Sequence, residues 1–348
     1  MSEALRLLEK AEAANEHRAT RGGRLAEQAL TAAIREDELP LGLRAILLAS
    51  KIRKSRGDIT GCIALRERGV VWLLEARPTL ESTLQHGVVL FLYWASGNIN
   101  NLRGSFDDIL ERIDAMEALL DAAELSHRRD GLAYIRAMLC SNRDDLKGAL
   151  SSISEAIELK EAHPNYGWGF SMESYQRIRV SWLRQLGRRE EAEAGIQAML
   201  RVERDQGRRV ELLCMLARCA HDAGDLDLAR QRIGEALQVA ALGGLEIEKH
   251  CLGASVDIYR ACGDFDEARR WAERYLDLVE TTGRRFYLSM ALEDVISTAL
   301  DQGDLAAARR FLDRAIPLAH EVDEGRGATV RVPIVEEQEA RLAELEAD

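Results

Sequence analysis

The chain has 348 residues, of which 47% are hydrophobic and 30% are charged, and its formal net charge is −12. This composition allows a large buried core, whereas the acidic net charge argues against nucleic acid as the main ligand, because phosphate binding needs a basic field. Only five prolines occur, and the abundant Ala, Leu, Glu and Arg residues lose little conformational freedom in a helix. The composition therefore predicts an all-α protein.

The first segment, from Met1 to Glu16, has the pattern of an amphipathic charged helix and lacks the apolar core of a signal peptide. No later stretch approaches the length and hydrophobicity of a membrane span. The six cysteines are scattered through helical stretches and do not frame loops, which is typical of reduced core thiols. We therefore expect a cytoplasmic protein without a membrane partner.

Helical periodicity and turn signals divide the chain into pairs of helices, each pair forming a hairpin. Since such a hairpin cannot bury its apolar face alone, we expect one cooperative solenoid over 1–348. Its repeats are degenerate in 1–125, where Arg56-Gly57-Asp58 and Ser96-Gly97-Asn98 are the turns we assign, and clear in 126–322. The predicted hairpins cover 2–37, 41–75, 79–123, 126–162, 168–206, 208–242, 246–281 and 284–322, and a capping helix covers 331–347.

Two segments interrupt this pattern: Asn98-Ile99-Asn100-Asn101, and the stretch from His163 to Phe170. The second contains Tyr166, Trp168 and Phe170 among glycines. These aromatic side chains could form a binding lip, because connectors carry function and aromatic rings supply rigid contact area. They could also plug the gap between two hairpins. We favour the plug, because Trp168 and Phe170 stand where the next helix needs core residues.

One short signal returns along the chain: a glycine turn, an acidic residue, and an alanine early in the following helix. Glycine ends a helix because it adopts the left-handed conformation cheaply, and the aspartate after it can cap the next helix. Alanine then lets the two helices of a hairpin approach closely. The copies are Ala223-Gly224-Asp225-Leu226-Asp227-Leu228-Ala229, Cys262-Gly263-Asp264-Phe265-Asp266-Glu267-Ala268 and Gln302-Gly303-Asp304-Leu305-Ala306-Ala307-Ala308, with weaker relatives ending at Ala192 and Ala149.

This pattern resembles the tetratricopeptide repeat, with good matches at Ala217, Ala229, Ala236, Tyr259 and Ala268. The early tryptophan and late proline of that family are mostly missing, and the alanines recur at longer intervals than the family's roughly 34 residues. Long repeats of this kind are similar to the sensor repeats of maltose-regulator-like transcription factors and of Gram-positive quorum-sensing regulators. The resemblance implies a right-handed superhelical solenoid whose first helices line a concave surface.

Aligning the copies on their glycine turns places seven polar residues on the inner face of three successive first helices. By resemblance they are candidates for contacting a peptide, and the arginine fork suits a carboxylate of the partner. The alternative is that they form salt bridges between adjacent hairpins, which are individually weak. The seven are Arg177, Arg184, Glu211, Arg218, His221, Asp257 and Arg260.

The sequence contains none of the common catalytic motifs: no phosphate-binding glycine loop, no His-Glu-x-x-His, no paired Cys-x-x-Cys and no Gly-x-Ser-x-Gly. The nearest approach to a metal site is Cys214, Cys219 and His221, with His250-Cys251 in the next repeat. Five residues spread two thiols by more than a right angle around a helix, so core packing is the better interpretation. We expect no catalytic residue, no cofactor and no metal.

Three functions are compatible with this sequence. The first is a non-enzymatic adaptor that binds a protein or peptide along the concave face. The second is a regulatory sensor that binds a signalling peptide or small ligand and controls an effector on another chain. The third, an enzyme, needs a constellation of residues that the sequence does not show. Homo-oligomerisation through a terminal hairpin stays open.

Overall fold

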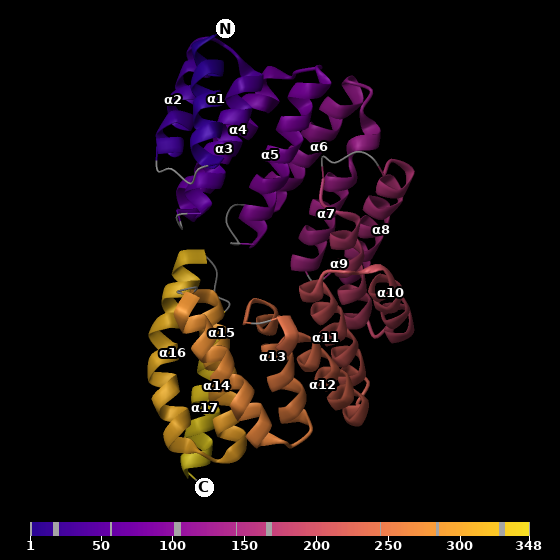
Figure 1. Cartoon of the computed structure of the whole chain (residues 1–348), viewed down its shortest axis with the longest axis vertical. Coiled ribbons are helices and arrows are strands. Elements are labelled where there is room, and N and C mark those ends of the chain that lie inside the picture. The colour runs from indigo at the N-terminus through magenta and orange to yellow at the C-terminus, as the bar shows by residue number, and fades with distance from the viewer. Residues whose placement is uncertain are drawn as a thin grey trace. The chain divides into compact units, whose positions relative to one another are not determined.

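The computed structural model describes residues 2–16, 21–55, 58–100, 106–143, 145–164, 169–243, 245–282, 285–326 and 331–347, and within these ranges regular structure is helical, with no strand (Figure 1). The prediction of an all-α protein is confirmed. None of the described helices is long and apolar enough to cross a membrane. The helices are α1 (Glu3–Glu16), α2 (Arg21–Arg35), α3 (Leu39–Ser55), α4 (Ile59–Ala76), α5 (Glu81–Asn100), α6 (Phe106–Ala122), η1 (Ser126–Arg128), α7 (Asp130–Asn142), α8 (Leu146–Ala162), α9 (Met172–Gln185), α10 (Arg189–Val202), α11 (Gln206–Asp222), α12 (Leu226–Gly243), α13 (Leu245–Ala261), α14 (Phe265–Thr282), α15 (Arg285–Gln302), α16 (Leu305–Arg326) and α17 (Val332–Ala347).

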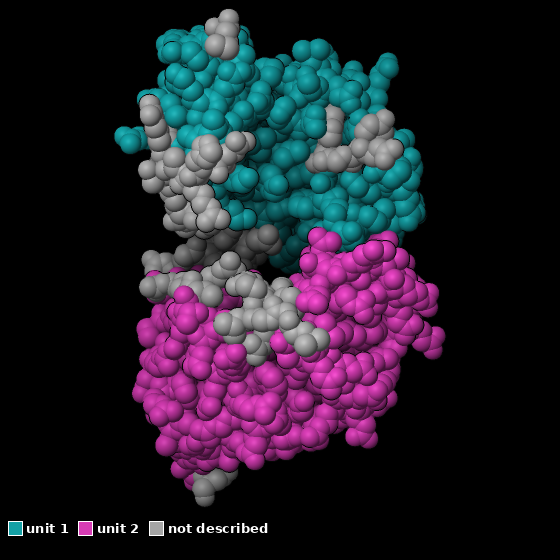
Figure 2. Space-filling view, in the orientation of Figure 1, with its two compact units in different colours: residues 1–175 teal, residues 176–348 magenta. Residues whose placement is uncertain are grey.

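The chain divides into two compact units, Met1–Tyr175 and Gln176–Asp348, with the boundary inside α9 (Figure 2). In the first unit, α1 packs on α2, α3 on α4, and α7 on α8, around a core that includes Leu43, Phe91 and Ile113. In the second unit, α11 packs on α12, α13 on α14, and α15 on α16. These are the hairpins that the repeat predicts; the single solenoid over 1–348 stays a prediction.

Glycine turns join the two helices of four hairpins in the second unit. Gly224 has a φ of 75°, in the left-handed region, and the N–H of the following Asp225 donates to the carbonyl of Ala220 at 3.0 Å. This backbone bond closes the end of α11. Asp225 then accepts from the N–H of Leu228 at 3.2 Å and caps α12. Gly187, Gly263 and Gly303 adopt the same conformation.

The alanine that follows each turn is fully buried. Ala149, Ala192, Ala229, Ala268 and Ala308 all have 0% of their surface exposed. A larger side chain at these points would separate the helices, because packed interiors leave little space for extra methylene groups. The small residue at this position therefore sets how closely the helices of each hairpin approach.

The predicted turn at Ser96-Gly97-Asn98 is wrong, because α5 continues through these residues to Asn100. Neither Gly97 nor Asn98 interrupts the helix. A methyl group on Gly97 would lie 3.5 Å from Ile63 of α4, which is an ordinary van der Waals distance, so packing alone does not require glycine at this position. The amide of the buried Asn98 donates to the carbonyl of Trp94, one turn earlier, at 3.0 Å. The predicted interruption therefore does not begin at Asn98.

In the predicted turn Arg56-Gly57-Asp58 and the predicted interruption at 98–101, three residues lie outside the described ones: Arg56, Gly57 and Asn101. Asp58, which directly follows Gly57, caps α4 because its side chain accepts from the N–H of Gly61 at 2.8 Å. An aspartate therefore caps the helix after this turn, as in the later repeats.

The last helix, α17, packs on α15 and α16. Gln338 donates from its amide to the carbonyl of Glu293 at 3.0 Å and to the hydroxyl of Ser297 at 2.7 Å. At its start, the N–H groups of Arg331 and Val332 donate to the carboxylate of Asp323. The helix therefore covers the face that the preceding hairpin would otherwise leave open.

Candidate binding groove

The first helices of the second unit line an open pocket of about 540 Å³. Residues three or four positions apart on α11 share one helix face, so Arg218, His221 and Asp222 reach the pocket together. Five of the seven predicted residues line it: Arg184, Arg218, His221, Asp257 and Arg260. The other lining residues are Asp222, Ile258, Ala261 and Asp301.

Ion pairs between adjacent hairpins cross this pocket. Arg184 of α9 contacts Asp222 of α11 at 2.6 Å. Arg218 of α11 contacts Asp257 of α13 at 3.3 Å, and Arg260 of α13 contacts Asp301 of α15 at 2.7 Å. We call these three pairs the ion-pair ladder. Four of the predicted groove residues thus form salt bridges between hairpins and also line the pocket: Arg184, Arg218, Asp257 and Arg260.

Asp222 and Asp301, which complete two rungs of the ladder, were not among the predicted residues. Both stand two positions before a turn glycine, Gly224 or Gly303. Comparing this position across the repeats would have pointed to them, since equivalent positions in stacked repeats face the same surface.

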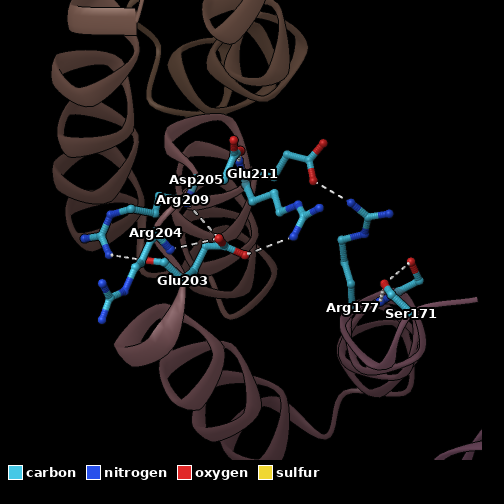
Figure 3. Close-up of polar contacts among 9 residues, drawn as sticks. Ser171, Arg177, Glu203, Arg204, Asp205, Arg209 and Glu211 are labelled. Atoms are coloured by element: carbon cyan, nitrogen blue, oxygen red, sulfur yellow. Dashed lines mark hydrogen bonds and ion pairs between the residues drawn. The ribbon is translucent and has the colours of Figure 1, made fainter. Parts of the chain in front are cut away.

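The remaining predicted residues, Arg177 and Glu211, do not line the pocket. They pair with each other at 2.6 Å across α9 and α11, and Figure 3 shows the two side chains pointing toward one another. Arg177 is exposed along 45% of its side chain. This pair therefore continues the pattern of inter-hairpin contacts beyond the pocket.

The ladder differs in solvent exposure from one rung to the next. Burial alone would raise the pKa of Asp301, but hydrogen bonds from Arg260 and Arg341 outweigh it and hold this pKa below its ordinary value. The middle rung, Arg218–Asp257, is longer and leaves 42% and 46% of the two side chains exposed. Exposed pairs of this kind contribute little to stability, so a ligand charge can replace one partner at small cost.

Asp294 of α15 is a further carboxylate near the ladder. A methyl group on Gly253 of α13 would lie 3.8 Å from Asp294 Oδ2. Burial, and then repulsion from Asp257 and Glu293, raise the pKa of Asp294 well above its ordinary value. Among the described residues it has no ion-pair partner.

The aromatic segment lies in the first unit. The centroid of the Phe170 ring lies 4.4 Å from that of the Tyr134 ring and 6.4 Å from that of the Tyr175 ring. The backbone N–H of Phe170 donates to the Tyr175 hydroxyl at 3.2 Å. That hydroxyl donates to the buried carboxylate of Asp130 at 2.9 Å. Phe170 is therefore partly buried and packs against the core of the first unit, while Tyr166 and Trp168 lie outside the described residues.

The cysteines of α11 belong to the core of the second unit. Cys214 and Cys219 are buried, and burial raises the pKa of Cys219 to about 11. A hydrogen bond with Cys251, together with burial, raises the pKa of Cys214. No group of three potential ligand side chains gathers to hold a metal ion in the part of the chain that is described.

No protein-family model matches this sequence, and no curated protein matches it. Solved structures are similar to it, among them two of Rap proteins. The apo form of RapI has 10% sequence identity and a TM-score of 0.55, over 87% of this chain and 86% of that one. A Rap protein complexed with competence and sporulation factor has 14% identity and a TM-score of 0.55, over 99% and 98% of the two chains. This chain has a tetratricopeptide-like fold.

Within the tetratricopeptide-like fold, all residues of the ladder come from first helices, namely α9, α11, α13 and α15. Neighbouring first helices are in contact, α11 with α13 and α13 with α15. Axes of packed helices lie roughly 9 Å apart. The ladder therefore presents charged side chains at regular intervals along the stack.

Proposed function

We propose that this protein is a non-enzymatic binding module that holds an extended peptide segment of another protein along the ion-pair ladder. The observation that supports this most directly is the pocket of about 540 Å³ lined by charges from successive first helices. An arginine fork can bind both oxygens of a peptide carboxylate, and the ladder aspartates can accept from a peptide ammonium or guanidinium. The proposed setting is the cytoplasm, as the sequence predicts.

The spacing of the ladder suits an extended peptide. A polyproline II segment advances about 3.1 Å per residue and returns to the same face every third residue, so three residues span the roughly 9 Å between neighbouring first helices. A bound peptide would meet one rung with every third side chain. We therefore expect a partner segment that carries charged residues three positions apart, with both signs present because the pocket holds arginines and aspartates in equal number.

A sensor role is the second candidate, and the position of the ladder favours it. Each rung ties one hairpin to the next, so a ligand that takes over one partner of a rung would change how adjacent hairpins pack. A Rap protein of this fold was solved with competence and sporulation factor bound. Here the ligand would be a signalling peptide, and the effector would be a separate chain.

Affinity capture from the native host tests the binding proposal. The Arg184→Gln and Arg218→Gln double variant should lose most of a stoichiometric partner, because both substitutions remove a guanidinium from the pocket. The matched control is Arg230→Gln together with Arg314→Gln. Arg230 pairs with Asp264 across hairpins at 2.6 Å, and Arg314 pairs with Glu280, both from second helices away from the pocket.

The control should retain the partner. Equal capture by the two double variants would contradict the assignment of the ladder as the binding surface. For the sensor, the captured segment is synthesised as a peptide, and its binding should raise the melting temperature of the wild-type protein but not of the Arg184→Gln and Arg218→Gln variant.

A further inference from the structure

A second pocket, of about 480 Å³, lies within the first unit, between α1, α3, α4 and α5. It takes up much of one face of α3, because positions 44, 47, 48, 51 and 54 recur at helical spacing. Its size falls in the range of sites for small molecules. The lining residues are Glu12, Arg44, Leu47, Leu48, Ser50, Lys51, Lys54, Arg66, His86, Val89 and Tyr93.

This pocket is positively charged, although the protein as a whole has a net charge of −12. Glu12 is its one carboxylate and pairs with Arg44 at 2.8 Å. Lys51, Lys54 and Arg66 have no carboxylate partner among the described residues. In the described part of the chain, three positive charges therefore face the pocket without a carboxylate partner.

Arg66 is the most informative of these residues, because only 8% of its surface is exposed. Its Nε donates to the hydroxyl of Ser50 at 3.2 Å, and its Nη1 donates to the carbonyl of Tyr93 at 3.1 Å. The guanidinium carbon also lies 5.2 Å from the centre of the Tyr93 ring. Neutral groups thus hold the guanidinium in place without cancelling its charge.

Burying a guanidinium without an anion costs free energy, because the group loses hydration and no opposite charge compensates for that loss. The cost falls when an oxyanion binds. The N–H groups of Arg66 that do not bond Ser50 or Tyr93 can donate to carboxylate or phosphate oxygens, which a guanidinium binds through strong charge-assisted hydrogen bonds.

The rest of the lining points to an organic anion. Leu47 and Leu48 on α3, and Val89 and Tyr93 on α5, supply apolar surface beside the cationic residues. Three positive charges match a doubly charged group better than a single carboxylate. We propose that this pocket binds a small organic phosphate, with the phosphate on Arg66, Lys51 and Lys54 and an apolar body against the leucines and Tyr93.

This site is independent of the proposed peptide groove, because all its residues belong to the first unit. Isothermal titration of the full-length protein with phenyl phosphate tests it. We expect a dissociation constant below about 1 mM, rising as salt screens the charges. Benzoate, which has the same ring and one negative charge, should bind at least about tenfold more weakly.

The Lys51→Ala and Lys54→Ala double variant should bind phenyl phosphate at least about tenfold more weakly than wild type. Both lysines are exposed, so its melting temperature should not change. The matched control, Lys10→Ala with Lys147→Ala, removes two exposed lysines of the same unit and should leave binding unchanged.

Equal affinities of the two lysine double variants would overturn the site. The absence of measurable binding to the wild-type protein at about 10 mM phenyl phosphate would also overturn it. Equal affinity for benzoate and phenyl phosphate would overturn the assignment of an organic phosphate. None of these results bears on capture of a partner by the ladder.

Discussion

At the residue scale, the raised pKa of Asp294 should make the stability of the second unit depend on pH. Burial, with the repulsion of Asp257 and Glu293, raises this pKa above its ordinary value. The folded protein therefore binds this proton more tightly than the unfolded chain does. As pH rises from the ordinary range of an aspartate through the folded-state pKa, the free energy of unfolding should fall.

The variant Asp294→Asn removes this charge, so we expect it to be more stable than wild type at about pH 7. Its advantage should shrink toward about pH 4, because wild-type Asp294 is then protonated. Urea unfolding at both pH values measures this difference. Asp277→Asn, an exposed position on α14, is the control and should show no such dependence; a similar profile for both variants would contradict the expectation.

At the element scale, the hairpins depend on how their turns and helices use glycine. Gly224 holds a φ of 75° with nothing within 4 Å of the position of a Cβ atom, so backbone conformation alone requires glycine there. Gly234 lies inside α12 with equally open surroundings and an ordinary helical backbone. Substitutions at these two glycines therefore test the effect of backbone conformation, because an added Cβ atom meets no neighbour at either position.

Gly224→Ala should lower the free energy of unfolding by about 1 kcal/mol, because a side chain is disfavoured in the left-handed region. Gly234→Ala should raise it by about 0.5–1 kcal/mol, because alanine is the better helix former. Chemical denaturation of both variants gives the two changes. An unchanged or higher free energy of unfolding in Gly224→Ala would show that the turn does not depend on its left-handed glycine.

At the scale of the whole molecule, the open question is cooperativity between Met1–Tyr175 and Gln176–Asp348. In a solenoid each repeat is stabilised by its neighbours, so unfolding spreads along the stack. The prediction of one solenoid over 1–348 therefore requires that the two units lose their structure together.

Hydrogen exchange measured by mass spectrometry across a urea series tests this requirement. Peptides from α5 and from α15 should lose protection at the same urea concentration, since cooperative units open as a whole. The glycine variants provide an internal check, because Gly224→Ala should then shift both midpoints. Two separate midpoints would contradict the single solenoid.

The sequence by itself determined the helices, most of the turns and the buried alanines. These features depend on residues a few positions apart: Gly224 ends α11 through its own backbone conformation, and Asp225 caps α12 through a bond to Leu228. The turn predicted at Ser96-Gly97-Asn98 was wrong, because a glycine inside a helix looks the same in sequence as one that ends a helix.

Only the tertiary structure decided which charges meet. The partners in the ladder stand 38, 39 and 41 residues apart, so their pairing depends on the distance between packed hairpins. The sequence placed Arg184 and Arg218 on the inner face but did not identify Asp222 and Asp301 as partners. The cationic pocket left no signal at all in sequence, because Lys51 and Arg66 come from different helices and packing alone brings them together.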